Sequence, residues 1–327
     1  MMRTSSLTAT ARTLAAGQDA TIIESHKQSA KPTYDGRRGY QPVVAVWAET
    51  GLVLADEFRD GNVPAAMAPL NCARTAFATL PTGLKQYYFR GDSACHEGDL
   101  LAWLSDEQRA GGPQGKIGFA ISARMTADLA RAVQQIHESS WKTIETETDG
   151  TRRQWAEVAF VPHDRHEQKD SLPLRYLAIR LIKAQGALFA DSTDRQHFAV
   201  VTNRMEDGAF LLNWQRLKAG TIEHVHDELK NGLGAGRMPS GKFGANAAWF
   251  RIACLTLNLV EGLRRAWADE ALRTAKLKRV RFEIFTVTGR VIRDGRKISL
   301  RLSASKDWIA NFIALFEAFP LVTRATG

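Results

Sequence analysis

The chain has few cysteines and no apolar run long enough to cross a membrane. Its three cysteines, Cys72, Cys95 and Cys254, are odd in number and widely spaced, and none belongs to a C-x-x-C pair. This pattern argues against a disulfide framework and a structural zinc site, so we expect small buried side chains. The apolar runs are far shorter than the roughly 20 residues that span a bilayer. We therefore predict no transmembrane helix and no membrane partner.

The start of the chain also lacks a secretory signal. Residues 1–18 are rich in Ser, Thr and Ala but contain no apolar segment of signal-peptide length. Their Arg and Ser content is only weakly typical of a transit peptide. The sequence therefore predicts a cytoplasmic protein.

Acidic residues are fewer than basic ones, and the excess of basic residues is distributed unevenly along the chain. There are 44 Lys and Arg against 35 Asp and Glu, which gives a formal net charge of +9 at pH 7. From Arg264 to Arg301 there are twelve Lys or Arg against four Asp or Glu. Such a stretch favours polyanions, because bound Lys and Arg release counterions from nucleic acid. A solvated basic face has the same composition, so charge alone leaves both interpretations open.

The first part of the chain has the alternation of strands and helices expected of an α/β domain. At 327 residues and 44% hydrophobic content the chain is long enough for two or three folded units. A strand before Asp19 is followed by a predicted hairpin and then by helices and single strands in turn. The predicted segments are a hairpin at 43–47 and 52–55, helices at 63–80 and 96–106, and strands at 87–92 and 117–122. Together they predict a mixed five-stranded sheet flanked by helices.

The middle of the chain changes character. After a predicted helix at 126–137, strand patterns dominate until about residue 205, which predicts a β-rich insertion over 126–205. Helical spacing resumes with Ile222, and a long helix is predicted at 245–267. The predicted core is therefore discontinuous, with residues 12–125 and 206–268 on either side of the insertion and a basic C-terminal segment at 269–327.

Three acidic residues stand where a metal-dependent site for phosphodiester chemistry would need them. Asp19 and Asp92 follow predicted strands, and Glu223 lies in a helical pattern. Alone, each Asp is more typical of a turn, and Glu223 of an amphipathic surface. However, a carboxylate at the end of a buried strand must face a cleft, a cation or a partner, because apolar neighbours cannot solvate it. Carboxylates are the ligands that Mg²⁺ prefers, and two ions about 4 Å apart support phosphodiester cleavage, so we expect the three acids to converge.

Other motifs are weaker. Residues 236–242 fit the start of a P-loop, but Phe243 replaces the Ser or Thr that binds Mg²⁺ and a helix precedes the segment. The polar residues between 163 and 167 include two His, an Asp and a Glu, for which a solvated loop is the simpler interpretation. His224 and His226 are two apart on a helix and point in different directions, so a shared zinc site is not expected.

With these motifs, the chain resembles the bacterial insertion-sequence transposases of the DDE group, which are cut-and-paste enzymes with a ribonuclease-H-like core. In that family the first Asp stands in a motif like Gln-Asp-Ala-Thr at 18–21, and the second in one like Arg-Gly-Asp-Ser at 90–93. Glu223 precedes Lys230 at the family's Glu-x6-Lys spacing. Segments 34–42 and 219–223 strengthen the resemblance, which covers roughly residues 19–301.

The resemblance implies a function and a set of site residues. Asp19, Asp92 and Glu223 would be catalytic and would hold two Mg²⁺ ions, for which Mn²⁺ can substitute. Water would attack double-stranded DNA at the element end, and the freed 3′-hydroxyl would join target DNA. Lys230 would contact a phosphate. The resemblance further implies a homodimer on DNA in a bacterial, nucleoid-associated protein.

Two departures from the family pattern leave alternatives open. The family's Tyr and Arg upstream of the Glu fall on Arg216 and Ala219, so Arg216 and Lys218 are the substitute candidates for DNA contact. In addition, only eighteen residues precede Asp19, whereas such enzymes usually have a sizeable DNA-binding region there. The resemblance thus predicts an N-terminally truncated transposase. The alternatives are a non-catalytic DNA-binding remnant that regulates a full-length enzyme and a stand-alone ribonuclease-H-like nuclease.

Overall fold

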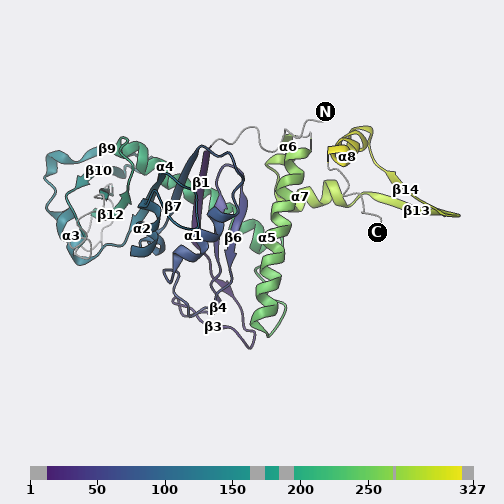
Figure 1. The fold of residues 1–327 in the computed structure, drawn as a ribbon, viewed down its shortest axis with the longest axis horizontal. Helices are drawn as coiled ribbons and strands as arrows, with labels where there is room; N and C mark the ends of the chain where they lie inside the picture. Colours follow the sequence, from purple (N-terminus) through teal and green to yellow (C-terminus); the bar gives the residue numbers. More distant parts are fainter. Residues whose placement is uncertain (1–12, 163–173, 184–194, 268–269, 319–327) are drawn as a thin grey trace. The chain divides into compact units, whose positions relative to one another are not determined.

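The protein is described by a computed structural model that covers residues 13–162, 174–183, 195–267 and 270–318. The chain folds into two compact units, Met1–His224 and Val225–Gly327, which are treated separately below. Figure 1 follows the chain through both units. The polar cluster predicted at 163–167 as a solvated loop lies outside the described residues.

A mixed sheet of nine strands forms the centre of the first unit (Figure 1). Its order is β6-β5-β1-β7-β8-β12-β11-β10-β9. Strands β6, β5 and β1 pair antiparallel, and β1, β7 and β8 run parallel to one another. These five strands confirm the predicted α/β, ribonuclease-H-like class. The bounds are β1 Thr13–Ala20, β5 Val43–Trp47, β6 Leu52–Glu57, β7 Gln86–Gly91, β8 Ile117–Ala123, β9 Lys142–Thr146, β10 Arg152–Val158, β11 Arg175–Ile182 and β12 Arg195–Thr202.

The sheet is larger than the five strands predicted, because the β-rich segment continues it. Residues Ala199–Thr202 of β12 pair antiparallel with Ala120–Ala123 of β8, and β11, β10 and β9 follow in turn. An edge at β8 would leave a row of unpaired backbone groups on an almost fully buried strand, and β12 removes that edge. The β-rich segment therefore belongs to the same compact unit as the first part of the predicted core, residues 12–125, while the predicted domain boundaries stay a prediction.

Helices cover both faces of this sheet. Leu14, Phe77, Phe89 and Leu104 belong to the core beneath α1, α2 and α3, and Leu177 belongs to the core beneath α4. Successive strand residues face opposite sides, so β7 contributes to both layers. The bounds are α1 Pro69–Ala78, α2 Gly98–Ser105, α3 Ala127–Gln134 and α4 Gly208–Asp227.

Helix α1 begins later than the predicted 63–80. Ala68 adopts a left-handed conformation with φ 45°, and Pro69 occupies the first turn of the helix. Proline fits a first helical turn because its missing N–H would have no partner there. A small separate sheet lies earlier in the chain, in the order β2-β4-β3. Its strands are β2 Ile23–Glu24, β3 Lys31–Pro32 and β4 Arg38–Tyr40.

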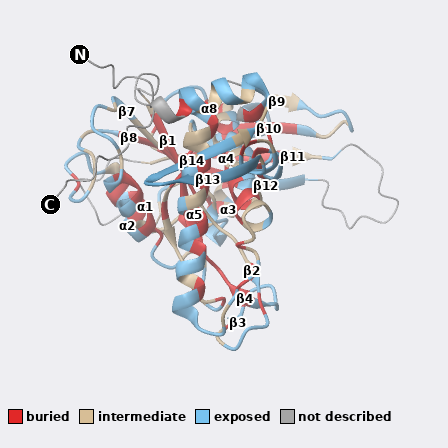
Figure 2. Cartoon of the chain, turned by 90° about the vertical axis from the view of Figure 1, so that its right-hand side faces the viewer, coloured by how far each residue is buried: buried red, intermediate tan, exposed pale blue. Residues whose placement is uncertain are grey.

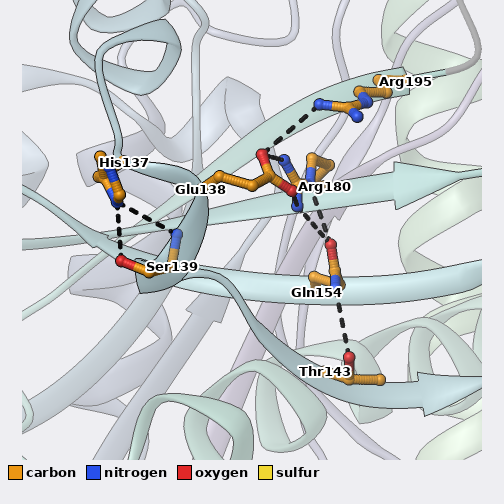
Figure 3. Close-up of polar contacts among 7 residues, drawn as sticks. All are labelled: His137, Glu138, Ser139, Thr143, Gln154, Arg180 and Arg195. Atoms are coloured by element: carbon orange, nitrogen blue, oxygen red, sulfur yellow. Dashed lines mark hydrogen bonds and ion pairs between the residues drawn. The ribbon is translucent and has the colours of Figure 1, made fainter.

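An arginine ties together the strands at the far end of the large sheet (Figure 3). Arg180 on β11 donates from Nη1 and Nη2 to the two carboxylate oxygens of Glu138, at 2.7 Å each. Its Nε donates to Gln154 of β10 at 3.0 Å, and Gln154 in turn donates to Thr143 of β9 at 3.2 Å. The Arg180 guanidinium also lies 4.4 Å from the ring centroid of Trp141. The contacts through Gln154 link β11, β10 and β9, and the bidentate pair attaches the buried Arg180 to the 3-10 turn Glu138–Ser140.

The second unit is mainly helical, with one exposed hairpin. Its core gathers apolar residues such as Trp267, Leu277 and Val280. Buried Glu228 lies 3.5 Å from Arg264 and accepts a hydrogen bond from the backbone of Leu277. The long helix predicted at 245–267 is α5. The bounds are α5 Phe243–Ala266, α6 Glu270–Arg273, α7 Leu277–Val280, β13 Thr288–Asp294, β14 Lys297–Ser303 and α8 Lys306–Ala318.

Among the described residues, one helix meets the minimum criteria for a membrane span. Helix α5 has 24 residues, and its most apolar window reaches a mean hydropathy of 1.2 with 33% of that window buried. A core helix of a soluble protein meets the same criteria, so this is weak evidence. The expectation of no membrane partner stays a prediction.

Candidate active site

Asp19 and Asp92 lie together at one edge of the large sheet. In the parallel pair of β1 and β7, Gln18 stands opposite Gly91, and each Asp is the next residue along its strand direction. The two carboxyl groups lie close enough for Asp92 to raise the pKa of Asp19. The carboxyl ends of adjacent parallel strands are where α/β folds place functional groups. The structure therefore brings two of the three predicted acids into one site.

The environment of Asp19 disfavours a bare negative charge. Burial raises its pKa to about 6, Lys218 opposes this rise, and the neighbouring Asp92 adds to it. Its Oδ1 accepts the backbone N–H of Ala20 at 2.9 Å. Asp92 also has a local role, because its Oδ1 accepts the backbone N–H of Ala94 at 3.0 Å and so caps a short 3-10 helix. Two adjacent carboxylates in a partly buried site repel each other unless a proton or a cation lies between them.

Lys218 supplies part of the opposing charge. Its Nζ lies 3.8 Å from Asp19 Oδ2, and its side chain is 10% exposed. Helix α4 packs over β1 near Gly17, where an added Cβ would lie in ordinary contact with Lys218 at 3.6 Å and with Ile222 at 4.0 Å. Lys218, which was proposed from the sequence for DNA contact, is thus buried against the carboxylate of Asp19.

Two further side chains attach α4 to the strands of the site. Arg90 on β7 donates from Nη1 to the carbonyl of Trp214 at 2.9 Å and lies 5.1 Å from the centroid of that ring. Gln215 donates from Nε2 to Ser122 Oγ at 3.0 Å and to the Gly91 carbonyl at 3.3 Å. Arg90 is 4% exposed, and burial lowers its pKa. The helix that carries Glu223 is therefore held to β7 and β8 by buried polar contacts.

The remaining predicted residues lie elsewhere. Glu223 is exposed on α4, about 140° around the helix axis from Lys218. Arg216 is exposed and pairs with Glu145, with 2.6 Å between Nη1 and Oε1. Lys230 lies in the second unit. Within the described ranges, no three His, Cys, Asp or Glu residues form a group that could hold a metal ion. The structure thus gathers Asp19 and Asp92 but does not group Glu223 with them.

The Asp19 and Asp92 pair fits a divalent cation by the chemistry of its donors. Both side chains offer carboxylate oxygens, which Mg²⁺ and Mn²⁺ prefer over nitrogen or sulfur. A bound cation would also offset the burial and the neighbouring Asp92 charge that raise the pKa of Asp19. The two Asp residues are therefore the part of the predicted ligand set that this geometry supports.

The sequence did not predict that Arg90 and Gln215 attach α4 to the strands of the site. A signal existed for Arg90, because an arginine inside the predicted strand 87–92 must find acceptors when it is buried. Gln215 offered no signal, since its partners are distant in sequence. Two other expectations are confirmed: the three cysteines are free and buried, and the P-loop-like segment 236–242 follows a helical turn, Glu228–Gly232, rather than a strand.

Comparison with known proteins places the chain in a family. Residues 13–322 match the model of the family described as transposase DDE domain group 1. No curated protein sequence matches the chain. Among solved structures, a cryo-EM structure of the piggyBac transposase synaptic complex with hairpin DNA matches with a TM-score of 0.46 and 9% identity, covering 76% of this chain and 46% of that one. The chain thus spans less than half the length of that transposase. Because the family model covers nearly the whole sequence, the chain belongs to the transposase DDE domain group 1 family.

Proposed function

We propose that this chain is an insertion-sequence transposase that hydrolyses a phosphodiester bond at element ends and joins the freed 3′-hydroxyl to target DNA. The observation that carries this proposal is the pair Asp19 and Asp92, held close together at the ends of two adjacent parallel strands. The family assignment supports the same activity.

Asp19 and Asp92 are the proposed ligands of the divalent ions, with Mg²⁺ as the natural ion and Mn²⁺ as a substitute. When bound, such ions lower the pKa of water and stabilise the charge that develops on a transferred phosphoryl group. Glu223 is the proposed third ligand, because it lies on the helix that packs over Gly17 at the same edge. To bind with the two Asp residues, its carboxylate must move toward them from its exposed position on α4.

The surrounding residues position this site. Lys218 offsets the charge of Asp19, and its ammonium group would shift when a cation binds there. Arg90 and Gln215 hold α4 against β7. A fixed helix matters because catalytic groups misplaced by about 1 Å lose much of their effect.

We further propose double-stranded DNA as the partner, with Arg216 and Lys230 contacting phosphates and a homodimer as the working form. The basic stretch from Arg264 to Arg301 supports a polyanionic partner. A cytoplasmic, nucleoid-associated location follows from that partner.

The direct test is DNA cleavage and joining by the purified chain. The substrate is linear DNA that carries the sequences flanking the gene, and a supercoiled plasmid serves as the target. We expect cutting and joining with Mg²⁺ or Mn²⁺, and loss of both in Asp19→Asn and Asp92→Asn. Asp99→Asn is the matched control, because Asp99 is an exposed carboxylate on α2. Cleavage at the wild-type rate by Asp92→Asn would overturn the site.

The same assay separates the alternatives. DNA binding without cutting by the wild-type protein would favour a non-catalytic regulator of a full-length enzyme. Cutting without joining would favour a ribonuclease-H-like nuclease.

Metal binding tests Glu223 independently of activity. Mn²⁺ titration followed by electron paramagnetic resonance measures affinity in wild type, Asp92→Asn and Glu223→Gln. We expect weaker binding in both variants. Unchanged affinity in Glu223→Gln would remove Glu223 from the ligand set and leave the two Asp residues in it.

A further inference from the structure

A second polar site lies in the first unit, at the opposite end of β7 from Asp92. A pocket of about 350 Å³ is lined by residues that precede or begin β7 and β8 and by residues that follow β12. Its volume is within the range of small-ligand sites. The lining residues used below are Lys85, Tyr88, Lys116, Gly118, Arg204 and Glu206.

The pocket has an excess of positive charge. Lys85, Lys116 and Arg204 contribute three cations, and Glu206 contributes one anion. Arg204 donates from Nε to Glu206 at 3.0 Å, and this hydrogen bond is the main reason that the pKa of Glu206 is lowered, with Lys116 adding a smaller effect. Glu206 thus neutralises one cation, and the two exposed lysines leave the pocket positive.

Arg204 keeps one unused donor. It is 7% exposed, and its Nη1 is buried without a hydrogen-bond partner among the described residues. Two rings hold its guanidinium in place, with 4.6 Å to the centroid of Tyr88 and 4.4 Å to that of Trp214. An unpaired N–H group on a rigid buried cation costs free energy unless a ligand supplies an acceptor.

The pocket exists because β8 carries a glycine at its wall. A Cβ at Gly118 would come within 2.9 Å of the Tyr88 ring and 3.2 Å of Arg204 Cδ. Any larger residue there would push the ring and the guanidinium from their present positions. The sequence thus leaves room for Arg204 beside two lysines.

We propose that this pocket binds a phosphate group, and that in the working protein it is a backbone phosphate of DNA at a distance from the cleaved bond. Oxyanions of phosphate match a fixed guanidinium and two ammonium groups better than any neutral ligand does. Strand β7 separates Lys85 from Asp92 by roughly 20 Å, at about 3.3 Å per residue. The phosphate chemistry rests on the pocket, whereas its assignment to DNA rests on the proposed function.

The first experiment measures phosphate binding alone. Inorganic phosphate is titrated into the full chain at constant ionic strength, and its ³¹P linewidth is followed by NMR. Saturable broadening is expected for wild type, with an affinity about tenfold or more weaker in Lys85→Ala/Lys116→Ala. Lys27→Ala/Lys31→Ala is the matched control, because both lysines are exposed and lie outside the pocket. Equal broadening in all three proteins would overturn a phosphate site here.

The second experiment identifies the source of the phosphate. DNA affinity is measured against salt concentration in EDTA, so that the result does not depend on cutting. The pocket variant should reduce the slope of log affinity against log salt by about 1 relative to the Lys27→Ala/Lys31→Ala control. An unchanged slope with weakened phosphate binding would overturn the DNA assignment and identify free phosphate as the ligand. A reduced slope in a protein that cuts no DNA would support the pocket while the proposed transposase activity fails.

Discussion

Strand β7 and the hairpin β13–β14 both combine apolar side chains with arginine, but their surroundings are opposite. In β7, Phe89 is fully buried and Arg90 is 4% exposed, whereas Val291 and Leu300 of the hairpin are 62% and 61% exposed. Figure 2 shows the hairpin almost entirely in the colour of exposed residues. Strand β7 is rich in aromatic residues and the hairpin in β-branched ones, and both kinds of side chain favour extended backbone. The difference shows that a sequence pattern can predict a strand, whereas the elements that pack on the strand decide whether it is buried in the core.

The arginines of the two regions differ in the same way. Arg180 and Arg90 are buried and hold elements of the first unit together. In the hairpin, Arg290 stands directly opposite Arg301, and both are exposed. Like charges opposite each other weaken a hairpin, so this pairing is unfavourable unless an anion lies nearby. We interpret the hairpin as a surface for a polyanion, in line with the charge of residues 264–301.

The largest expected difference between the two regions is catalytic. Asp92→Asn should lower DNA cleavage by at least about 10³-fold, equivalent to about 4 kcal/mol of transition-state free energy. Asp294→Asn, an exposed carboxylate at the end of β13, should leave cleavage within about twofold. Initial cleavage rates measure both. A comparable loss of cleavage in both variants would mean that the effect does not depend on the position of Asp92 at the end of β7.

A matched pair of leucines tests the contrast in burial. Leu177→Ala, at a fully buried position of the large sheet, should lower the free energy of unfolding by about 2–5 kcal/mol, through lost burial and the cavity left behind. Leu300→Ala should change it by less than about 0.5 kcal/mol. Urea denaturation measures both values. A large effect at Leu300 would show that another surface covers the hairpin in solution.

Arg180 and Arg301 form the corresponding pair of charges. Arg180→Ala should destabilise the first unit by about 2–4 kcal/mol, because Gln154 and Glu138 lose their shared donor. Arg301→Ala should leave stability unchanged and weaken DNA binding instead. Denaturation and DNA titration at fixed salt separate the two effects. Weaker DNA binding by a folded Arg180→Ala protein would contradict a purely structural role.

The smallest effect concerns the buried charge in metal-free protein. The folded-state pKa of Asp19 is raised to about 6, so the native state holds this proton more tightly than the unfolded state does. Stability should therefore fall as pH rises from about 4 to about 6 and stay lower above that. Asp19→Asn removes this dependence and should gain on the order of 1–3 kcal/mol relative to wild type at pH 8 in EDTA. Thermal unfolding across pH measures it, and parallel profiles for the two proteins would contradict the raised pKa.

Local patterns predicted much of the fold. The hairpin of β5 and β6, the strands β7 and β8 and the helix α5 match their predicted segments closely. Alternation and helical spacing depend only on neighbours in sequence, so a single sequence reveals them. The extension of the sheet beyond β8 could not be predicted in this way, because the residues of β12 and its sequence neighbours do not indicate that it pairs with β8.

The candidate site also has a part that the sequence could predict and a part that it could not. That Asp19 and Asp92 lie near each other was predictable, because each stands at the end of a strand and parallel neighbours end at one edge. The contact between Lys218 and Asp19 was not, because it depends on how α4 lies across Gly17. The role of Glu223 stays a prediction, since helical spacing gives its face on α4 but not the reach of its carboxylate.

By itself the sequence determined most strands and helices of this protein, its net charge and the position of two aspartates at strand ends. Each of these depends only on composition or on residues close together in the chain. Only the tertiary structure decided that nine strands share one sheet, that Arg90, Gln215 and Lys218 join α4 to β1 and β7, and that Lys85, Lys116 and Arg204 meet in a pocket. The physical reason is that such contacts join residues far apart in the chain, and their free energy is gained only when packing brings those residues together.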